Sequence, residues 1–264
     1  MTTGRRPPVP VRDLLGVLLT ELGQAPVWSA QTPFEYVCGA VLVQNTAWRN
    51  VERALAALRE TTGCDAQRLL ELTDAELTSL IRPAGFMRAK SRTLRAYAAW
   101  SLSPAGRSAT GLDDDDLRRT LLALPGIGPE TADVLALMVF SRRRFIFDAY
   151  GRRLLAQAGY AVGRDYESTR RALEERIDAE GLSHAELVDL HGLILEAGKR
   201  ARAAGGWEVY GPSIGVQPRP GAGPRADRGR EPGPDVADLR RRCTGHRPRL
   251  SGSLSAHHGK ATRS

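Results

Sequence analysis

The apolar residues of this chain recur at spacings of three and four from Val11 to about Gly206, with almost no two-residue alternation. This period places apolar side chains along one face of a helix, whereas a half-buried strand would alternate apolar and polar residues. The pattern predicts an all-α fold, with helices at residues 11–22, 33–46, 48–61, 64–70, 74–81, 87–101, 113–123, 130–140, 149–158, 166–180 and 184–203. We expect Pro104 and Gly106 to break one helix, and the segment 126–129 to separate two others.

Length and composition exclude several classes of protein. With 264 residues, of which 42% are apolar, the chain can bury the core of one or two domains. No apolar run approaches the roughly 18 residues that a membrane span needs, and the first residues do not resemble a signal peptide. Cys38, Cys64 and Cys243 are too widely spaced to indicate a disulfide framework or a metal cage. We therefore expect a cytoplasmic protein without a metal site.

The net charge of +8 is concentrated in the C-terminal segment. From residue 211 on there are 11 Lys and Arg against 4 Asp and Glu, whereas residues 1–210 carry 27 against 26. Overall basicity is therefore weak evidence for nucleic-acid binding, because the part expected to fold is almost neutral. Residues 207–264 are rich in Gly, Pro and Arg, and their composition predicts a disordered tail, which either binds phosphate nonspecifically or is sequence read in a shifted frame.

The segment Leu-Pro-Gly-Ile-Gly-Pro at residues 124–129 is the most informative motif. Gly126 and Gly128 lack side chains that would keep an anion from the backbone N–H groups, and Ile127 between them can anchor the turn in an apolar core. Pro129 suits the first turn of a helix, whose N-terminal N–H groups attract phosphate; Thr131 lies in that turn. A tight helix connection is the alternative, but the flanking helices favour a phosphate-binding hairpin made by Gly126, Ile127, Gly128 and Thr131.

These motifs together resemble a known family. LPGIGPETAD at residues 124–133, followed by FIFDAYGRRLL at residues 145–155, resembles the hairpin and catalytic segment of the endonuclease III-like helix-hairpin-helix (HhH-GPD) DNA glycosylases. Asp148 stands twenty residues after Gly128, which is the family's spacing for its catalytic aspartate. Residues 32–46 and 191–199 resemble the first barrel helix with its Gln-x-Thr turn and a late helix, so that the similarity covers about residues 25–206.

The resemblance implies two helical domains and a DNA substrate. One domain would be a six-helix barrel containing the hairpin, at residues 25–142, and the other would combine residues 1–24 and 143–206. Duplex DNA with a damaged base would lie between them, bound by a monomer associated with the nucleoid. Asp148 would stabilise an oxocarbenium-like sugar or activate water, although it is also a good helix N-cap.

Glu130 occupies the position at which the bifunctional branch of this family carries a lysine. A carboxylate cannot form the imine that strand cleavage requires, so we predict a monofunctional glycosylase; the P-E-T-A-D version resembles a branch that includes a 3-methyladenine glycosylase. Two alternatives remain open. One is a bifunctional glycosylase with abasic-site lyase activity, and the other is a noncatalytic hairpin protein that recognises damaged DNA and has no need for Asp148.

Further site residues follow from the resemblance. Gln44 matches the family residue that fills the gap left by a flipped base, and Trp28 matches a tryptophan that lines the lesion pocket. Glu130 would lie at the same pocket. Phe34 and Trp48 could stack on the base, but aromatic residues at such spacings usually belong to a core. Lys199 is a candidate phosphate contact, as are the arginines at positions 152, 153 and 200, against the alternative of solvated helix faces.

The sequence departs from the family in its cysteines. Many relatives hold a 4Fe-4S cluster with four cysteines after the last helix, but only Cys243 follows that helix here. We therefore expect no cofactor. The damaged base is left open by the sequence, with alkylated purines slightly ahead of oxidised pyrimidines and mismatched bases.

Overall fold

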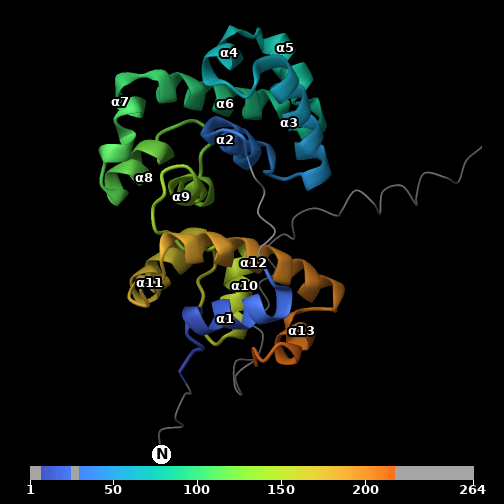
Figure 1. Cartoon of the computed structure of the whole chain (residues 1–264), viewed down its shortest axis with the longest axis vertical. Coiled ribbons are helices and arrows are strands. Elements are labelled where there is room, and N and C mark those ends of the chain that lie inside the picture. The colour runs from blue at the N-terminus through green and yellow to red at the C-terminus, as the bar shows by residue number, and fades with distance from the viewer. Residues whose placement is uncertain (1–6, 25–29, 218–264) are drawn as a thin grey trace, which may run out of the picture. The chain divides into compact units, whose positions relative to one another are not determined.

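The computed structural model describes residues 7–24 and 30–217, and all of its regular elements are helices (Figure 1). In chain order they are α1 (Val11–Leu22), α2 (Pro33–Leu42), α3 (Trp48–Thr62), α4 (Ala66–Glu71), α5 (Asp74–Leu80), η1 (Arg82–Ala84), α6 (Met87–Leu102), α7 (Pro104–Arg107), η2 (Ala109–Gly111), α8 (Asp114–Leu122), α9 (Pro129–Met138), α10 (Ala149–Gln157), α11 (Tyr166–Asp178), α12 (His184–Ala203) and α13 (Trp207–Ser213). The prediction of an all-α fold is confirmed.

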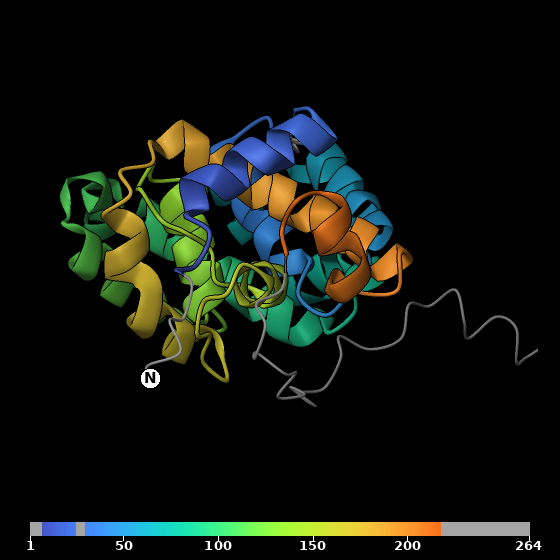
Figure 2. The same ribbon diagram turned by 90° about the horizontal axis from the view of Figure 1, so that it is seen from below.

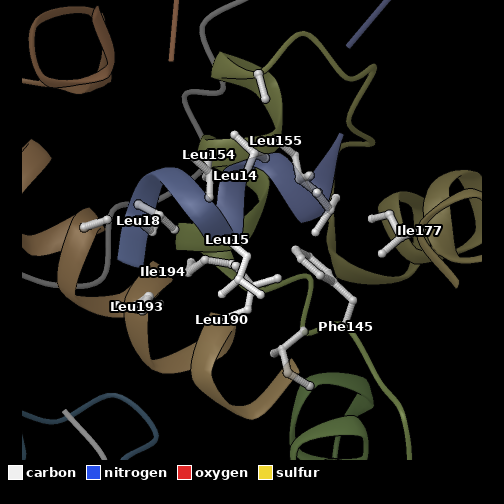
Figure 3. Close-up of a cluster of buried hydrophobic side chains, with 14 of the residues drawn as sticks. Leu14, Leu15, Leu18, Phe145, Leu154, Leu155, Ile177, Leu190, Leu193 and Ile194 are labelled. Carbon is white, nitrogen blue, oxygen red and sulfur yellow. The ribbon is translucent and has the colours of Figure 1, made fainter. Parts of the chain in front are cut away.

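Buried apolar side chains form two separate cores. The first gathers α1, α10, α11, α12 and α13, with leucines of α1 packed against those of α10 and α12 (Figure 3). In this core α1 packs along α12, as the view from below also shows (Figure 2). The second core is built by residues of α2 through α9. The predicted division into two helical domains stays a prediction, which the two cores support.

Helix α9 contributes to both cores. Its Ala132, Leu135 and Ala136 belong to the core built by α2 through α9, whereas Leu137 belongs to the core around α12. His184 at the start of α12 also hydrogen-bonds the Leu137 carbonyl through Nε2, at 2.8 Å. Because α9 is the second helix of the predicted hairpin, the hairpin is tied directly to both groups of helices.

Local sequence signals explain where most helices begin. Side chains of Thr32, Asp65, Asp113 and Ser183 accept hydrogen bonds from backbone N–H groups three residues later, at the first turns of α2, α4, α8 and α12. Such caps satisfy N–H groups that have no acceptor within the helix. Asp148 caps α10 in the same way. The aspartate singled out by the sequence is therefore also a structural cap.

The structure corrects some of the predicted boundaries. Helix α2 ends at Leu42, not at residue 46. Helix α9 ends at Met138, not at residue 140, because the chain turns away through Ser141, which has a φ of 54°. The sequence did not predict α7, a single turn capped by Ser103. A Cβ at Gly106 in that turn would lie 2.0 Å from the Trp100 carbonyl oxygen, so this glycine permits close contact with α6.

The predicted start of the disordered tail, at residue 207, is wrong. Residues 207–213 form α13, and Trp207, Tyr210 and Val216 are buried in the core around α12. These apolar residues are few, but they follow a long helix and fold back onto it. The rest of the predicted tail, from residue 218 on, lies outside the described residues. Among the residues described, no helix is long and apolar enough to cross a membrane.

Candidate active site

The hairpin between α8 and α9 has the form that the sequence predicted. Ile127 is buried at 5% exposure in the core of α2 through α9, where it anchors the turn. Gly126 has a φ of 78°, and a Cβ at this position would lie 2.0 Å from Thr93 Oγ1 on α6. Both the left-handed backbone and the contact with α6 therefore require glycine at position 126.

Gly128 is a different case, because nothing within the protein requires it. Its φ is −91°, which other residues also adopt, and a Cβ would meet no atom within 4 Å. Gly128 caps α9, and the N–H groups of the first turn of a helix have no acceptor within that helix. The open space above Gly128 leaves these N–H groups accessible to an anion.

Asp148 is buried at the N-terminus of α10. Its residue exposure is 6%, and Oδ1 accepts a hydrogen bond of 2.6 Å from the backbone N–H of Gly151. Burial raises the pKa of Asp148 to about 6, against the backbone hydrogen bonds of Gly151 and Tyr150 and the nearby charges of Arg152 and Arg153, which lower it. The carboxylate is thus desolvated, yet still ionised at neutral pH.

Two glycines permit this arrangement. A Cβ at Gly151 would lie 2.7 Å from the Ile146 carbonyl oxygen and 3.2 Å from Asp148 Oδ1, so a side chain there would disturb the cap. A Cβ at Gly198 on α12 would lie 2.0 Å from Tyr150 Cδ1, so the Tyr150 ring rests directly on α12. Sequence analysis did not identify Gly151, although its position three residues after an N-cap aspartate is a signal that could have done so.

Glu130, in the first turn of α9, has a raised pKa. Burial and then the charge of Asp148 raise the pKa of Glu130 to about 7, against the nearby charge of Arg152. The residue as a whole is exposed to solvent. Asp148 and Glu130, which the sequence had assigned to one site, thus interact electrostatically.

Gln44 joins the same region through the hairpin helix. Its Nε2 donates a hydrogen bond of 3.1 Å to Thr131 Oγ1 in the first turn of α9. Lys90 on α6 is buried and donates to three backbone carbonyls, those of Leu42 and Gln44 at 2.8 Å and that of Ala84 at 2.9 Å. The ammonium group therefore holds the turn that carries Gln44.

Three large apolar side chains in the segments that lead to Gln44 or to Lys90 are exposed. Val43 is 41% exposed, Trp48 is 37% exposed and Phe86 is 66% exposed. Phe86 has a φ of 49°, and its ring centroid lies 6.0 Å from the Lys90 Nζ that also contacts the Gln44 carbonyl. A left-handed, exposed phenylalanine is unusual unless it serves a function. Sequence analysis missed Phe86, because exposure and φ are not visible in apolar spacing.

The remaining predicted site residues are more scattered. Trp28 lies outside the described residues. Phe34 is partly buried and packs against Tyr97 at a ring distance of 6.2 Å, as expected of a core residue. Lys199 is exposed on α12, where its Nζ lies 3.4 Å from Glu196 Oε2. The structure places Lys199 on a solvated helix face without linking it to the hairpin.

The cysteines described do not fit a four-cysteine cluster. Cys38 and Cys64 are buried in the core of α2 through α9 and interact with each other, whereas a 4Fe-4S cluster needs four thiolates. Within residues 7–24 and 30–217, no group of three or more His, Cys, Asp or Glu side chains could hold a metal ion.

Known proteins resemble this chain in sequence and in fold. The family model of the HhH-GPD superfamily base excision DNA repair proteins matches residues 38–179. A protein of Methanocaldococcus jannaschii named as a DNA repair glycosylase is 32% identical over 189 residues, which cover 70% of this chain and 84% of the relative. An endonuclease III of Sulfolobus acidocaldarius is 27% identical over 169 residues, or 63% of this chain and 73% of that protein.

Solved structures agree with the fold. A 3-methyladenine DNA glycosylase of H. pylori, crystallised with 1,N6-ethenoadenine, superimposes with a TM-score of 0.62 at 24% identity, covering 73% of this chain and 98% of that one. An endonuclease III in a complex with DNA gives a TM-score of 0.52 at 20% identity, covering 70% and 82%.

The chain belongs to the HhH-GPD superfamily of base excision DNA repair proteins. DNA glycosylase is therefore its general class of enzyme.

Proposed function

We propose that this protein is a monofunctional DNA glycosylase, which flips a damaged base out of duplex DNA and hydrolyses its N-glycosidic bond with Asp148 as the catalytic carboxylate. The observation that carries the proposal is the buried Asp148 carboxylate at the N-terminus of α10, together with the open hairpin turn at Gly128. Asp148 supplies the chemistry, the hairpin binds the DNA, and Glu130 stands where a bifunctional relative would carry its lysine.

DNA binding is assigned to the hairpin. The space above Gly128 admits a phosphate oxygen to the first-turn N–H groups of α9, and the helix dipole adds to the attraction. This mode of binding needs no basic patch, in agreement with the nearly equal numbers of acidic and basic residues in positions 1–210. The protein acts on the duplex as a monomer in this proposal.

The flipped base leaves a gap that the surface around Gln44 fills. Gln44 can hydrogen-bond the unpaired base of the opposite strand, because its amide has both donors and an acceptor. Val43 and Trp48, which are close to Gln44 in sequence, supply apolar surface for contact with unstacked bases. Phe86, which is linked to the Gln44 turn through Lys90, supplies more. The turn that presents Gln44 is held rigid by the three carbonyl bonds of Lys90.

Bond cleavage requires a negative charge next to the sugar. As the base departs, positive charge develops on the deoxyribose, and an ionised carboxylate in a desolvated site stabilises it strongly. Asp148, with a pKa of about 6, is ionised at neutral pH and can also accept a proton from the attacking water. Glu130, with a pKa of about 7, is about half protonated there, which limits its repulsion of Asp148.

No lysine in the described residues is suited to form an imine with the sugar. Lys90 Nζ is engaged with three carbonyls inside the core of α2 through α9, and Lys199 lies beside Glu196 on a solvated face. Water is therefore the nucleophile in our proposal.

Alkylated purines are the proposed lesions. One structural relative is named as a 3-methyladenine DNA glycosylase, and the P-E-T-A-D motif resembles that branch. Alkylated purines carry a positive charge or are electron-poor, which weakens the glycosidic bond and suits a site with aromatic and anionic groups.

The test uses duplexes that each contain one lesion: 3-methyladenine, 1,N6-ethenoadenine, an oxidised pyrimidine or a mismatch. Base release is scored by strand cleavage with and without a final alkali treatment. We expect cleavage of alkylated-purine DNA by the wild-type protein only after alkali, and none by Asp148→Asn. The matched control is Asp65→Asn, which alters another N-cap aspartate, one that caps α4 through a 2.9 Å bond from the Arg68 N–H and is not part of the proposed site.

Other outcomes separate the alternatives. Strand cleavage without alkali, together with covalent trapping by borohydride on abasic DNA, would establish the bifunctional alternative. Retained DNA binding without base release from any duplex would favour a noncatalytic damage-recognition protein, and release of an oxidised pyrimidine or a mismatched base would correct the lesion class.

A further inference from the structure

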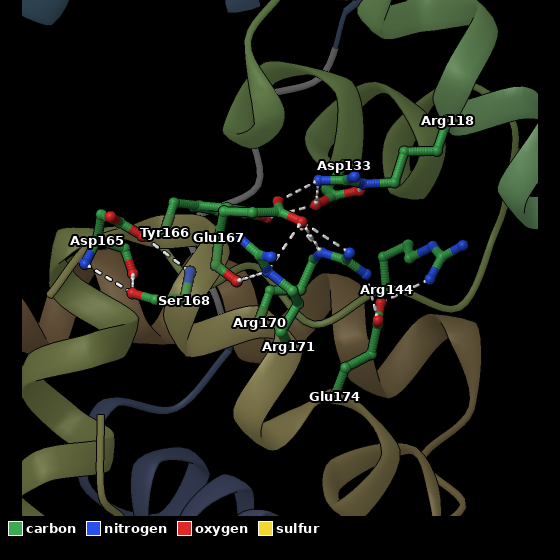
Figure 4. Close-up of polar contacts among 10 residues, drawn as sticks. All are labelled: Arg118, Asp133, Arg144, Asp165, Tyr166, Glu167, Ser168, Arg170, Arg171 and Glu174. Atoms are coloured by element: carbon green, nitrogen blue, oxygen red, sulfur yellow. Dashed lines mark hydrogen bonds and ion pairs between the residues drawn. The ribbon is translucent and has the colours of Figure 1, made fainter. Parts of the chain in front are cut away.

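A buried polar contact links the hairpin helix to the segment that carries Asp148. Asp133 lies on α9 one turn after Glu130 and is 1% exposed. Its Oδ1 accepts a hydrogen bond of 2.9 Å from Arg118 Nε, and its Oδ2 accepts one of 2.9 Å from the Tyr166 hydroxyl (Figure 4). A carboxylate this deeply buried is costly unless its partners are held in place.

Tyr166, at the start of α11, contacts the residue directly before Asp148. The rings of Tyr166 and Phe147 meet edge to face, with centroids 6.2 Å apart and planes at 87°. Tyr166 therefore contacts Asp133 through its hydroxyl and the segment that leads into Asp148 through its ring.

Arg118 fixes the other side of Asp133. It reaches from α8 to Asp133 and also donates from Nη2 to Glu167 Oε2 at 2.7 Å, on the same first turn of α11 as Tyr166 (Figure 4). Arg118 is largely buried, at 11% side-chain exposure. The helices on both sides of the hairpin, α8 and α9, are thus bonded to α11 through one group of charged side chains.

We propose that Tyr166 and Asp133 are positioning residues, which hold the Asp148 carboxylate in register with the phosphate-binding hairpin. This inference rests on the proposed function and deepens it. The hairpin determines where the DNA backbone lies, and Asp148 must meet the sugar of the nucleotide bound there. A displacement of about 1 Å between the two would misplace the carboxylate relative to the glycosidic bond.

The chemistry of position 166 supports a role beyond packing. A phenylalanine would fill the same volume and keep the contact with Phe147, without placing a polar group in the core. The tyrosine adds a hydroxyl that donates a hydrogen bond to Asp133 on α9. Such a bridge determines the position of one backbone segment relative to another, because hydrogen bonds are directional and apolar contacts are not.

The test compares Tyr166→Phe with Tyr160→Phe. Tyr160 is a matched control, because it is also buried and its hydroxyl donates to a carboxylate, that of Glu180, at 3.2 Å. With protein in excess over lesion DNA, we expect Tyr166→Phe to release base about 10- to 100-fold more slowly than wild type. Affinity for the duplex should stay within about 2-fold of wild type in both variants. The rate of base release by Tyr160→Phe should also stay within about 2-fold of wild type.

Two further measurements distinguish positioning from general stabilisation. Asp133→Asn should slow base release like Tyr166→Phe, and the double variant should lose little more, because the two residues act as one unit. Hydrogen exchange of the 145–149 backbone should become faster in Tyr166→Phe and stay unchanged in Tyr160→Phe.

Unchanged base release and unchanged exchange in Tyr166→Phe would overturn the inference, even if Asp133→Asn failed to fold. Equal losses in Tyr166→Phe and Tyr160→Phe would also overturn it, because they would indicate a general effect on stability. If the wild-type protein released no base at all, the proposed function would fail, and the exchange measurement alone would then decide whether Tyr166 positions the Asp148 segment.

Discussion

Asp148 is both a helix cap and a buried charge, and these two properties have opposite effects on stability. As a cap, its Oδ1 satisfies the Gly151 N–H at the start of α10. As a carboxylate at 6% exposure, it is ionised at neutral pH in a site that disfavours the charge. An uncharged cap would cost less in this buried position, which supports the catalytic role that we propose for the carboxylate.

Asp148→Asn should therefore stabilise the fold while it abolishes base release. The pKa of Asp148 is raised from 3.8 to about 6, so stability falls as the pH rises through this window, and the whole penalty is present at pH 7. Removal of the charge should raise the free energy of unfolding at pH 7 by about 1 to 3 kcal/mol, since an asparagine can still cap the helix.

Urea unfolding at pH 7 and at pH 4 measures this effect, which should nearly vanish at the lower pH. Asp165→Asn is the control, because hydrogen bonds to Ser168 lower the pKa of Asp165 and its carboxylate favours the fold. A loss of stability in Asp148→Asn at pH 7 would contradict the interpretation.

The two carboxyl groups also predict a pH profile for base release. Asp148 must be ionised, so the single-turnover rate should fall below about pH 6. Ionisation of Glu130, with its pKa of about 7, should add a second inflection near neutral pH, because its charge then acts on Asp148. In Glu130→Gln the inflection near pH 7 should disappear and the one near pH 6 should remain. A wild-type profile that is flat down to pH 4 would exclude a buried catalytic Asp148.

At the scale of elements, the two glycines of the hairpin have different roles, one in folding and the other in the proposed binding of DNA. Gly126 is required by its φ of 78° and by its contact with Thr93, whereas Gly128 has an ordinary φ and open space around its Cα. Two glycines that look equivalent in the motif thus serve different purposes. The first shapes the turn, and the second leaves room for a phosphate.

Substitution of the two glycines should therefore have different results. Gly126→Ala should lower the free energy of unfolding by at least about 1 kcal/mol, because of its left-handed backbone and the clash with Thr93. Gly128→Ala should change stability by less than about 0.5 kcal/mol, yet weaken DNA binding about 10-fold. Thermal unfolding and DNA titration by fluorescence anisotropy measure the two effects. Equal DNA affinity of Gly128→Ala and wild type would show that no phosphate approaches this glycine.

At the scale of the whole molecule, two apolar cores meet through α9, through the ion pair of α8 with α11 and through the hydrogen bond of α11 with α9. The core around α12 is closed from both ends of the described chain, by α1 and by α13. Trp207, Tyr210 and Val216 all belong to it, and Gln157 Nε2 donates to the Val216 carbonyl at 3.1 Å. The functional half of the fold that carries Asp148 therefore extends to the last described residues.

Truncation should reveal the contribution of α13. A chain that ends at residue 206 loses three buried side chains, at a cost of about 1.5 to 3 kcal/mol for each large apolar one. We expect a clear fall in its urea midpoint relative to a chain that ends at residue 217, which keeps α13 and Val216 and serves as the control. Equal midpoints of the two truncated chains would show that α13 adds nothing to the core around α12.

The sequence by itself determined the all-α class, most helix starts and the hairpin, because each depends on neighbouring residues: apolar spacing, N-caps, and the turn chemistry of glycine and proline. Asp148 was chosen through the family resemblance, and its catalytic role stays a prediction. Only the tertiary structure decided the electrostatic interaction of Glu130 with Asp148 and the hydrogen bond of Lys90 to the Gln44 carbonyl. It also decided the exposure of Phe86 and the hydrogen bond of Tyr166 to Asp133. These features join residues far apart in the chain. They depend on how helices pack, and no local pattern of residues encodes a contact between distant segments.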